Sequence, residues 1–256
     1  MIMDLQLFEK EYTVHVYETG TDGRLNIFSL FNYMQDVASE HAVRLGFGRD
    51  DLLKNNHFWV LSRMYVVITE WPGWDRKIIL KTWPNGTDKL FAMRNYLAEY
   101  PDGRQIASAT SSWLIVDRTT RRIQRPGETL TLFARAFRPE SSPVRKAEKL
   151  PGYDDNPKPS DIFRVKISDL DVNHHTNNAN YLKWIYNTYG LDFVNNHYPC
   201  SAEINYLAES LFEDEIVIFT QNHGNHVFDH SVRRIADNKE LCRIRIVWKE
   251  SGDAAN

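Results

Sequence analysis

The stretch from Ser168 to Trp184, "SDLDVNHHTNNANYLKW", places a carboxylate, an amide and an imidazole at alternate positions, Asp171, Asn173 and His175. Such groups serve in general acid–base catalysis and in orienting reactants. Side chains at alternate positions project to one side of an extended chain, whereas a helix would turn Asn173 away from the other two. We therefore expect an extended segment that presents the three groups together.

Two asparagines, Asn177 and Asn178, follow this cluster and precede an apolar, aromatic run. Asn is a favoured helix N-cap, and the first N–H groups of a helix lack partners within it and carry partial positive charge. The pattern predicts a helix from Asn178 to Val194 whose N-terminal amides point toward the polar cluster. These amides could stabilise a developing oxyanion.

Other interpretations of the cluster remain. Asp and Asn also favour such places simply because they hydrogen-bond locally in caps and turns. A calcium loop beginning at Asp169 is excluded, because His174 stands where the sharp-turn Gly is needed and Asn180 where the bidentate Glu is needed. A transition-metal site is disfavoured because adjacent His side chains diverge in an extended segment, so we expect no metal and no cofactor.

The elements around the cluster form a degenerate internal repeat. A first helix, Asn26 to Val43 with Asn26 as N-cap, matches the second at an offset of 152. Two hairpins, "EYPDGRQIASATSSWLIV" and "RIADNKELCRIRIVW", match at an offset of 135, so that Asp102-Gly103 falls on Asp237-Asn238. Gly and Asn both tolerate the positive φ of tight turns. One helix followed by antiparallel strands is therefore expected twice.

The repeat predicts two domains and one active site. Residues 1–137 and 161–256 read as the domains, and residues 138–160, rich in Pro, Ser and charge, as a linker. The helix offset maps the three polar residues of the second copy onto Thr19, Thr21 and Gly23. The first copy therefore lacks an acid or an imidazole there, and we expect it to have another use.

Composition narrows the class of protein. The 256 residues are 42% hydrophobic and 25% charged with a net charge of -3, which gives no general electrostatic reason to bind nucleic acid. No apolar run approaches the ~20 residues needed to cross a bilayer, and the first residues lack the order of a secretory signal. Cys200 and Cys242 form no CxxC pattern. We expect a cytoplasmic protein without disulfides.

The motif "DVNHHTNNANYLKW" resembles the D-x-N-x-H-x-N-N motif of the acyl-acyl carrier protein thioesterases, the enzymes that end fatty acid synthesis, and the chain is identified as a bacterial member. "FWVLSRMYVVITEWPGW" and "DRTTRRIQRP" are similar to two further segments of that family. The resemblance implies an α+β fold, a tandem double hotdog in which each half is a long central helix wrapped by an antiparallel β-sheet.

The resemblance also implies hydrolysis of fatty acyl-acyl carrier protein to free fatty acid, with Glu209 as a further catalytic residue beside Asp171, Asn173 and His175. Ser210 stands where plant members carry a cysteine. A serine nucleophile is disfavoured because no G-x-S-x-G elbow surrounds it. We expect Asp171 or Glu209 to activate water or to attack directly, and the sequence leaves that choice open.

The partner implied by the resemblance is an acyl carrier protein with a phosphopantetheine-linked acyl chain, bound by a monomer or homodimer. From Arg118 to Lys149 there are nine Lys/Arg against three Asp/Glu, so an acidic carrier could dock near Arg118, Arg121, Arg122 and Arg125. Aromatic residues of the first domain could line an acyl pocket or simply form its core: Phe28, Phe31, Trp59 and Trp83.

Two other functions remain open. A hotdog hydratase or dehydratase has a D-x-N-P-x-H signature, but here His174 replaces the Pro and Thr176 takes the position of the His. A hotdog acyl-CoA thioesterase differs only in its carrier. A non-catalytic acyl-binding regulatory module would be favoured by loss of Asp171 or Glu209, and both are present.

Overall fold

The structure is a computed structural model that describes residues 6–125, 143–152 and 159–253, and the chain divides into two compact units, Met1–Ala147 and Glu148–Asn256. The predicted linker, 138–160, lies partly outside the described residues. No helix among the described residues is long and apolar enough to cross a membrane.

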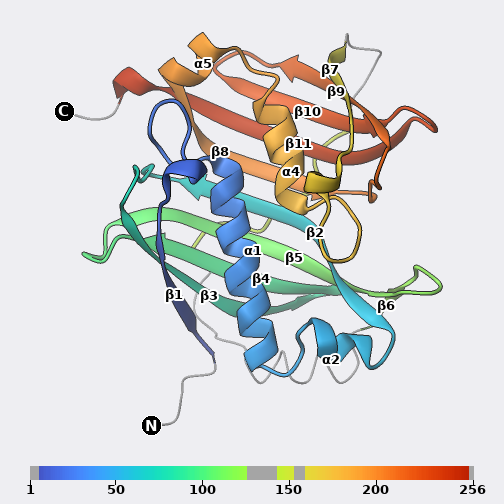
Figure 1. Cartoon of the computed structure of the whole chain (residues 1–256). Helices are drawn as coiled ribbons and strands as arrows, with labels where there is room; N and C mark the ends of the chain where they lie inside the picture. Colours follow the sequence, from blue (N-terminus) through green and yellow to red (C-terminus); the bar gives the residue numbers. More distant parts are fainter. Residues whose placement is uncertain (1–5, 126–142, 153–158, 254–256) are drawn as a thin grey trace. The chain divides into compact units, whose positions relative to one another are not determined.

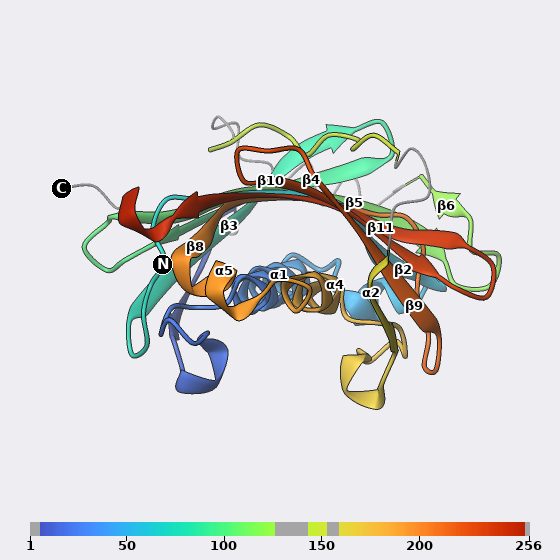
Figure 2. The same ribbon diagram turned by 90° about the horizontal axis from the view of Figure 1, so that it is seen from above.

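The first unit is an antiparallel sheet that curves around one long helix, α1 (Ile27–Arg44) (Figures 1 and 2). The strands lie in the spatial order β1 (Phe8–Thr13), β3 (Lys77–Asp88), β4 (Phe91–Glu99), β5 (Gln105–Asp117) and β2 (His57–Ile68), and β6 (Ile123–Gln124) pairs with β5. The short helices are η1 (Val16–Glu18) and α2 (Arg49–Leu53).

Helix α1 forms where its apolar spacing predicts it, with Asn26 as the N-cap residue. Leu30, Met34 and Val37 recur at helical spacing and are fully buried. Each such side chain contributes about 1.5–3 kcal/mol when it leaves water, so this face binds α1 to the sheet.

The second unit repeats the arrangement. Its strands lie in the order β7 (Pro159–Arg164), β9 (Glu215–Asn222), β10 (Val227–Arg234), β11 (Lys239–Glu250) and β8 (His197–Tyr206). The other elements are η2 (Ile167–Asp169), α4 (Asn178–Tyr186), α5 (Leu191–Asn196) and η3 (Ser251–Asp253). The predicted pairing of one helix with one antiparallel sheet in each half is confirmed.

One predicted helix boundary is wrong. The helix expected from Asn178 to Val194 ends at Tyr186, and α5 begins after Gly190. The Thr188 hydroxyl donates to the Ile185 carbonyl oxygen at 2.8 Å, which favours ending the helix, and Gly is a poor helix former.

The repeat extends to individual turns. Gly103 and Asn238 both have positive φ, 87° and 52°, as the hairpin offset of 135 requires. The helices, however, are equivalent at an offset of 151, because Asn26 and Asn177 are the two N-cap residues. The sequence comparison, which equated Asn26 with Asn178, was one residue out of register.

The described part of the predicted linker is attached to each sheet. In the first unit Thr110 Oγ1 donates to the Arg145 carbonyl oxygen at 2.9 Å. In the second, the Leu150 N–H donates to Oδ1 of the buried Asn205 at 2.8 Å. These bonds satisfy polar side chains on strands that would otherwise be buried without partners.

Candidate active site

The segment before α4 is a tight turn, not the extended strand that we expected. Leu170 and Thr176 form an isolated antiparallel bridge, and within it the Asp171 N–H donates to the His175 carbonyl oxygen at 2.8 Å. His174 adopts a left-handed φ of 63°. Asp side chains favour such turns because they accept hydrogen bonds from the backbone two residues on.

The Asp171 carboxylate organises this turn. Its Oδ1 accepts the N–H of Asn173 at 2.7 Å and that of His175 at 3.3 Å, and its Oδ2 lies 3.4 Å from the Asn173 side-chain amide nitrogen. The local-capping interpretation therefore describes what Asp171 does within the loop. The same bonds fix Asn173 and His175 relative to each other.

His175 meets Glu209, which is distant in sequence. His175 Nδ1 lies 3.4 Å from Glu209 Oε1, and the two side chains are 21% and 32% exposed, so that water reaches both. Thr176 and Ser210, the residues that follow His175 and Glu209, hold the two loops together. The Thr176 N–H donates to the Ser210 carbonyl oxygen at 3.0 Å, and Ser210 Oγ donates to Thr176 Oγ1 at 2.7 Å.

Ser210 therefore connects two loops and is not placed for nucleophilic attack. It is fully buried, and its hydroxyl also lies 2.9 Å from the Tyr181 hydroxyl. Neither cysteine is activated, because burial raises the pKa of the Cys200 thiol and raises that of Cys242 well above its usual value. A thiolate nucleophile needs the opposite shift.

Asn177 caps α4, and in doing so it satisfies two of the helix's first three amides. Its Oδ1 accepts the Ala179 N–H at 2.9 Å, and its carbonyl oxygen accepts the Asn180 N–H at 2.9 Å. The carbonyl oxygen of Asn178 accepts the Tyr206 hydroxyl at 3.1 Å. The amides of Ala179 and Asn180 are thus committed within the protein, which weakens the expectation that they hold an oxyanion.

Arg234, on β10, contacts the loop that carries Glu209, and the sequence analysis missed it. Its guanidinium donates to the Glu209 carbonyl oxygen at 3.5 Å and to the Asp214 carboxylate at 3.2 Å, and it also binds Asp237. It thereby fastens the loop that carries Glu209. Its only sequence signal was its place just before the Asp237 turn.

The four aromatic candidates of the first unit lie on three elements, α1, β2 and β3. Phe28 and Phe31 lie in its first two turns, whereas the Trp59 indole donates to the carbonyl oxygen of Phe47, beyond the C-terminal end of α1. At ~1.5 Å of rise per residue, Phe28 and Arg44 are separated by roughly 24 Å along α1. Phe31 and Trp83 are buried, and Phe28 and Trp59 half-buried.

The basic candidates surround the turn between β5 and β6. The Asp117 carboxylate accepts the N–H groups of Thr119 and Thr120, and Arg121 has a φ of 59°. The four arginines Arg118, Arg121, Arg122 and Arg125 are exposed, and residues 126–142 of the basic segment lie outside the described part of the chain.

The first unit contains the same turn with other side chains. Gly20 N–H donates to the Arg24 carbonyl oxygen at 2.8 Å and Leu25 N–H to the Pro72 carbonyl oxygen at 2.9 Å, which are the bonds made by Asp171 and Thr176. Asp171, Asn173 and His175 are therefore equivalent to Gly20, Asp22 and Arg24, not to Thr19, Thr21 and Gly23. By the same bonds Glu209 is equivalent to Trp71.

Comparisons with known proteins cover almost the whole chain. Residues 5–131 match the family described as "Acyl-ACP thioesterase N-terminal domain", and residues 154–250 match "Acyl-ACP thioesterase C-terminal domain". A palmitoyl-acyl carrier protein thioesterase, chloroplastic, of Gossypium hirsutum is 28% identical over 97% of this chain. The chain spans 65% of the length of that relative.

Solved structures share the fold. An acyl-ACP thioesterase from Bacteroides thetaiotaomicron superposes with a TM-score of 0.87 at 25% identity, covering 97% of this chain and 100% of that one. The 12:0-ACP thioesterase from Umbellularia californica gives a TM-score of 0.86 at 24% identity, covering 96% and 98%. The expected tandem double hotdog is thereby confirmed.

Proposed function

Because the chain belongs to the acyl-ACP thioesterase family, we propose that it hydrolyses the thioester of fatty acyl-acyl carrier protein and releases the free fatty acid. The observation that carries the proposal is the contact of His175 with Glu209, held by the Thr176–Ser210 bonds. A base, a carboxylate and a nearby amide at a water-accessible position supply the groups that thioester hydrolysis requires.

We had expected Asp171 or Glu209 to activate water, but because His175 contacts Glu209 we assign His175 as the base that takes a proton from water. Its Nδ1 faces Glu209, so the neutral ring that donates from Nδ1 carries its lone pair on Nε2. Glu209 holds this tautomer and stabilises the imidazolium that forms, as a carboxylate does for histidine in other hydrolases. The hydroxide adds to the thioester carbonyl, and the proton passes to the departing thiolate.

Asp171 and Asn173 complete the arrangement. Asp171 is committed to the amides of the turn and acts by positioning Asn173 and His175. The Asn173 amide has two N–H donors, of which one faces Asp171, and we assign the other to the developing oxyanion. The N-terminal dipole of α4, behind Asn177 and Asn178, favours the same negative charge.

The substrate is tested by comparing carriers. We expect turnover of a series of acyl-acyl carrier protein thioesters to exceed that of the same acyl groups on coenzyme A, with Glu209→Gln as the inactive control. Equal rates on both carriers would favour a general acyl-CoA thioesterase. Dehydration of hydroxyacyl thioesters without hydrolysis would favour the hydratase. Trapping of an acyl group on Glu209 would show direct attack by the carboxylate.

We propose that the exposed arginines of the β5–β6 turn dock the acidic carrier. Reversing Arg121, Arg122 and Arg125 to Glu should raise KM for acyl-carrier substrates by about 10-fold at low salt and leave small synthetic thioesters unaffected. Arg49, Arg76 and Lys89, also exposed in the first unit, provide a triple reversal with the same change in net charge. If both triple variants behave alike, only net charge matters.

A further inference from the structure

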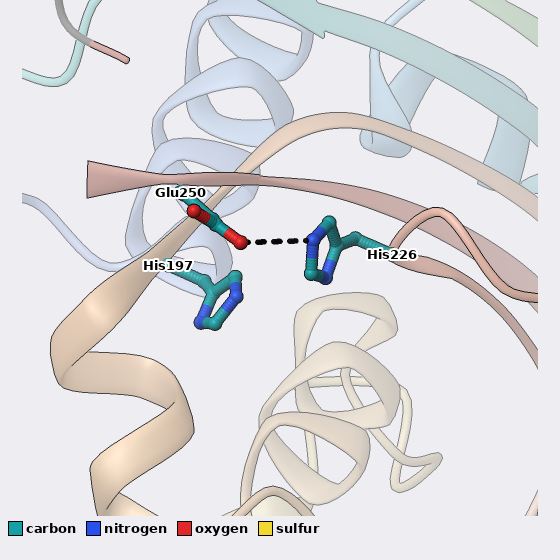
Figure 3. A group of neighbouring side chains, drawn as sticks. All are labelled: His197, His226 and Glu250. Carbon is teal, nitrogen blue, oxygen red and sulfur yellow. Dashed lines mark ion pairs between the residues drawn. The ribbon is translucent and has the colours of Figure 1, made fainter. Parts of the chain in front are cut away.

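Three side chains of the second unit come together outside the candidate active site. His197, His226 and Glu250 each offer one ligand atom, and these atoms lie within 4.8 Å of one another. Figure 3 shows the three side chains directed toward one another from separate strands and a turn. Among the described residues, no other group of three His, Cys, Asp or Glu side chains is close enough to hold a metal ion.

Backbone hydrogen bonds fix the elements that carry these side chains. His197 begins β8 and lies opposite Glu250, the last residue of β11, in the register of the two strands. His226, in the turn before β10, accepts the Trp248 N–H at 2.9 Å through its carbonyl oxygen. Side chains opposite each other in an antiparallel pair have Cβ atoms about 5 Å apart, so the sheet itself brings the ligands close.

The spacing of one ligand pair already suits a tetrahedral ion. His226 Nε2 lies 3.4 Å from Glu250 Oε1. Ligand atoms bound to zinc at about 2.0–2.1 Å with tetrahedral angles are separated by about 3.3 Å. The distance between these two atoms therefore suits an ion that both of them bind.

The third ligand is oriented by its own hydrogen bond. His197 Nδ1 lies 2.9 Å from the Phe193 carbonyl oxygen, and its ring stacks on the Phe193 ring at 4.1 Å. A carbonyl oxygen only accepts, so Nδ1 carries the proton and Nε2 carries the lone pair. Metal-binding histidines are commonly held in this way, with the second ring nitrogen donating to a carbonyl or carboxylate oxygen.

We propose that His197, His226 and Glu250 form a site for a divalent transition-metal ion of the zinc class, with water as the fourth ligand. Two imidazoles favour such an ion over Mg²⁺ or Ca²⁺, which prefer oxygen ligands. The ion joins the start of β8, the β9–β10 turn and the end of β11. Because it binds the folded chain, it stabilises the second unit.

The test is calorimetric titration of the full, EDTA-treated chain with ZnCl₂ and, separately, MgCl₂. We expect saturable 1:1 binding of zinc, no comparable binding of magnesium, and a rise in Tm of roughly 5 °C at zinc concentrations near 100 times Kd. His197→Ala and His226→Ala should each weaken zinc binding by about 10-fold or more. His223→Ala is the matched control, because His223 lies in the same hairpin but pairs with Asp229 at 3.0 Å.

Several outcomes would overturn the proposal. Zinc binding that is undiminished in His197→Ala and His226→Ala places the ion elsewhere, and absence of saturable binding removes the site. Melting of the metal-free variants separates misfolding from loss of ligands. Glu250→Gln, at an exposed strand end, provides a further variant whose fold we expect to be intact. Unchanged zinc affinity in that folded variant would contradict a role for the carboxylate.

Discussion

The turn before the long helix occurs once in each unit, and only the second copy brings an imidazole to a carboxylate. Both copies make the same backbone bonds, and Gly23 and His174 occupy the same left-handed position, with φ values of 71° and 63°. The first copy carries Gly20, Asp22 and Arg24 where the second carries the candidate catalytic residues. The geometry of the turn therefore belongs to the fold, and the chemistry belongs to the side chains placed on it.

An aspartate within this turn is not by itself a sign of catalysis. Asp22 Oδ1 accepts the Arg24 N–H at 3.0 Å, much as Asp171 Oδ1 accepts the Asn173 N–H at 2.7 Å. What distinguishes the second copy is the partner across the loop, where Glu209 replaces the equivalent Trp71. The chemical proposal accordingly depends on the histidine–glutamate contact.

The largest expected effect is a difference in kcat between substitutions of Asp171 and of Asp22. Asp171→Asn should lower kcat by about 100-fold, because the loop that orients Asn173 and His175 loses its carboxylate. Asp22→Asn, the same chemical change in the first turn at the position equivalent to Asn173, should leave kcat within about 2-fold. Steady-state kinetics with an acyl-acyl carrier protein, together with melting curves, provide the comparison. Equal small losses from both variants would reduce Asp171 to a turn former.

The buried histidines of the two units also differ. His41 lies 3.0 Å from the Arg94 guanidinium, whereas His230 lies between the Tyr189 and Thr220 hydroxyls at 2.7 and 3.0 Å. Burial lowers the pKa of His230 to about 3. The unfolded chain, with a histidine pKa of about 6.5, therefore binds the extra proton first.

Below about pH 6.5 this difference should destabilise the second unit by roughly 1.4 kcal/mol per pH unit, until the pH approaches 3. Above pH 6.5 the histidine is neutral in both states and contributes no slope. Urea unfolding of the native chain and of His230→Gln between pH 7 and pH 5 measures the contribution. Parallel pH profiles for the two proteins would show that the folded and unfolded chains bind the same number of protons at His230, which would contradict the lowered pKa.

The preference for acyl chains of different lengths tests whether the first unit contacts the acyl tail. If its helix face contacts the acyl tail, Phe28→Ala and Phe31→Ala should shift relative rates between acyl lengths by about 10-fold while retaining activity. Simple loss of core would lower Tm and activity uniformly, at a cost of ~3–5 kcal/mol per buried aromatic. Tyr186→Ala, a partly buried aromatic on α4, is the control. Early melting with an unchanged profile would make the first unit a scaffold.

Local sequence patterns predicted the helix α1 and the hairpin turns, because interactions between neighbouring residues determine these elements. The apolar spacing of α1 with its Asn26 cap and the positive φ at Gly103 and Asn238 all follow from neighbouring residues. The motif supplied His175 and the family resemblance supplied Glu209, although neither gave their contact. Hydrogen bonds between residues far apart in the sequence could not be predicted from local patterns. The Thr176–Ser210 clamp and the role of Arg234 depend on how loops meet.

The cluster that we propose to bind a metal ion and the register of the repeat were missed for related reasons. His197, His226 and Glu250 have no ligand spacing, because the pairing of β8 with β11 and the β9–β10 turn bring them together. The helix offset of 152 was taken from the alignment of similar apolar side chains. Apolar side chains on two helices can be aligned one residue out of register and still look alike, whereas the hydrogen bonds of a turn fix the register. The N-cap residues Asn26 and Asn177 and the turn bonds revealed the offset of 151.

The smallest expected effect concerns the left-handed position that the two turns share. Gly tolerates positive φ, and no atom lies within 4 Å of where a Cβ would stand on Gly23, so Gly23→Ala should cost about 1 kcal/mol through the backbone alone. His174→Gly should raise the free energy of unfolding by about 0.5–1 kcal/mol for the same reason, since His174 has a φ of 63°. Chemical denaturation of both variants measures these opposite shifts. Because His174 is exposed while Asp171 and His175 face the site, kcat of His174→Gly should stay within about 2-fold of the native value. A large loss of kcat in His174→Gly, with the free energy of unfolding unchanged, would mean that the His174 side chain takes part in the chemistry. His174 would then join Asp171, Asn173 and His175 as a functional difference between the second turn and the first.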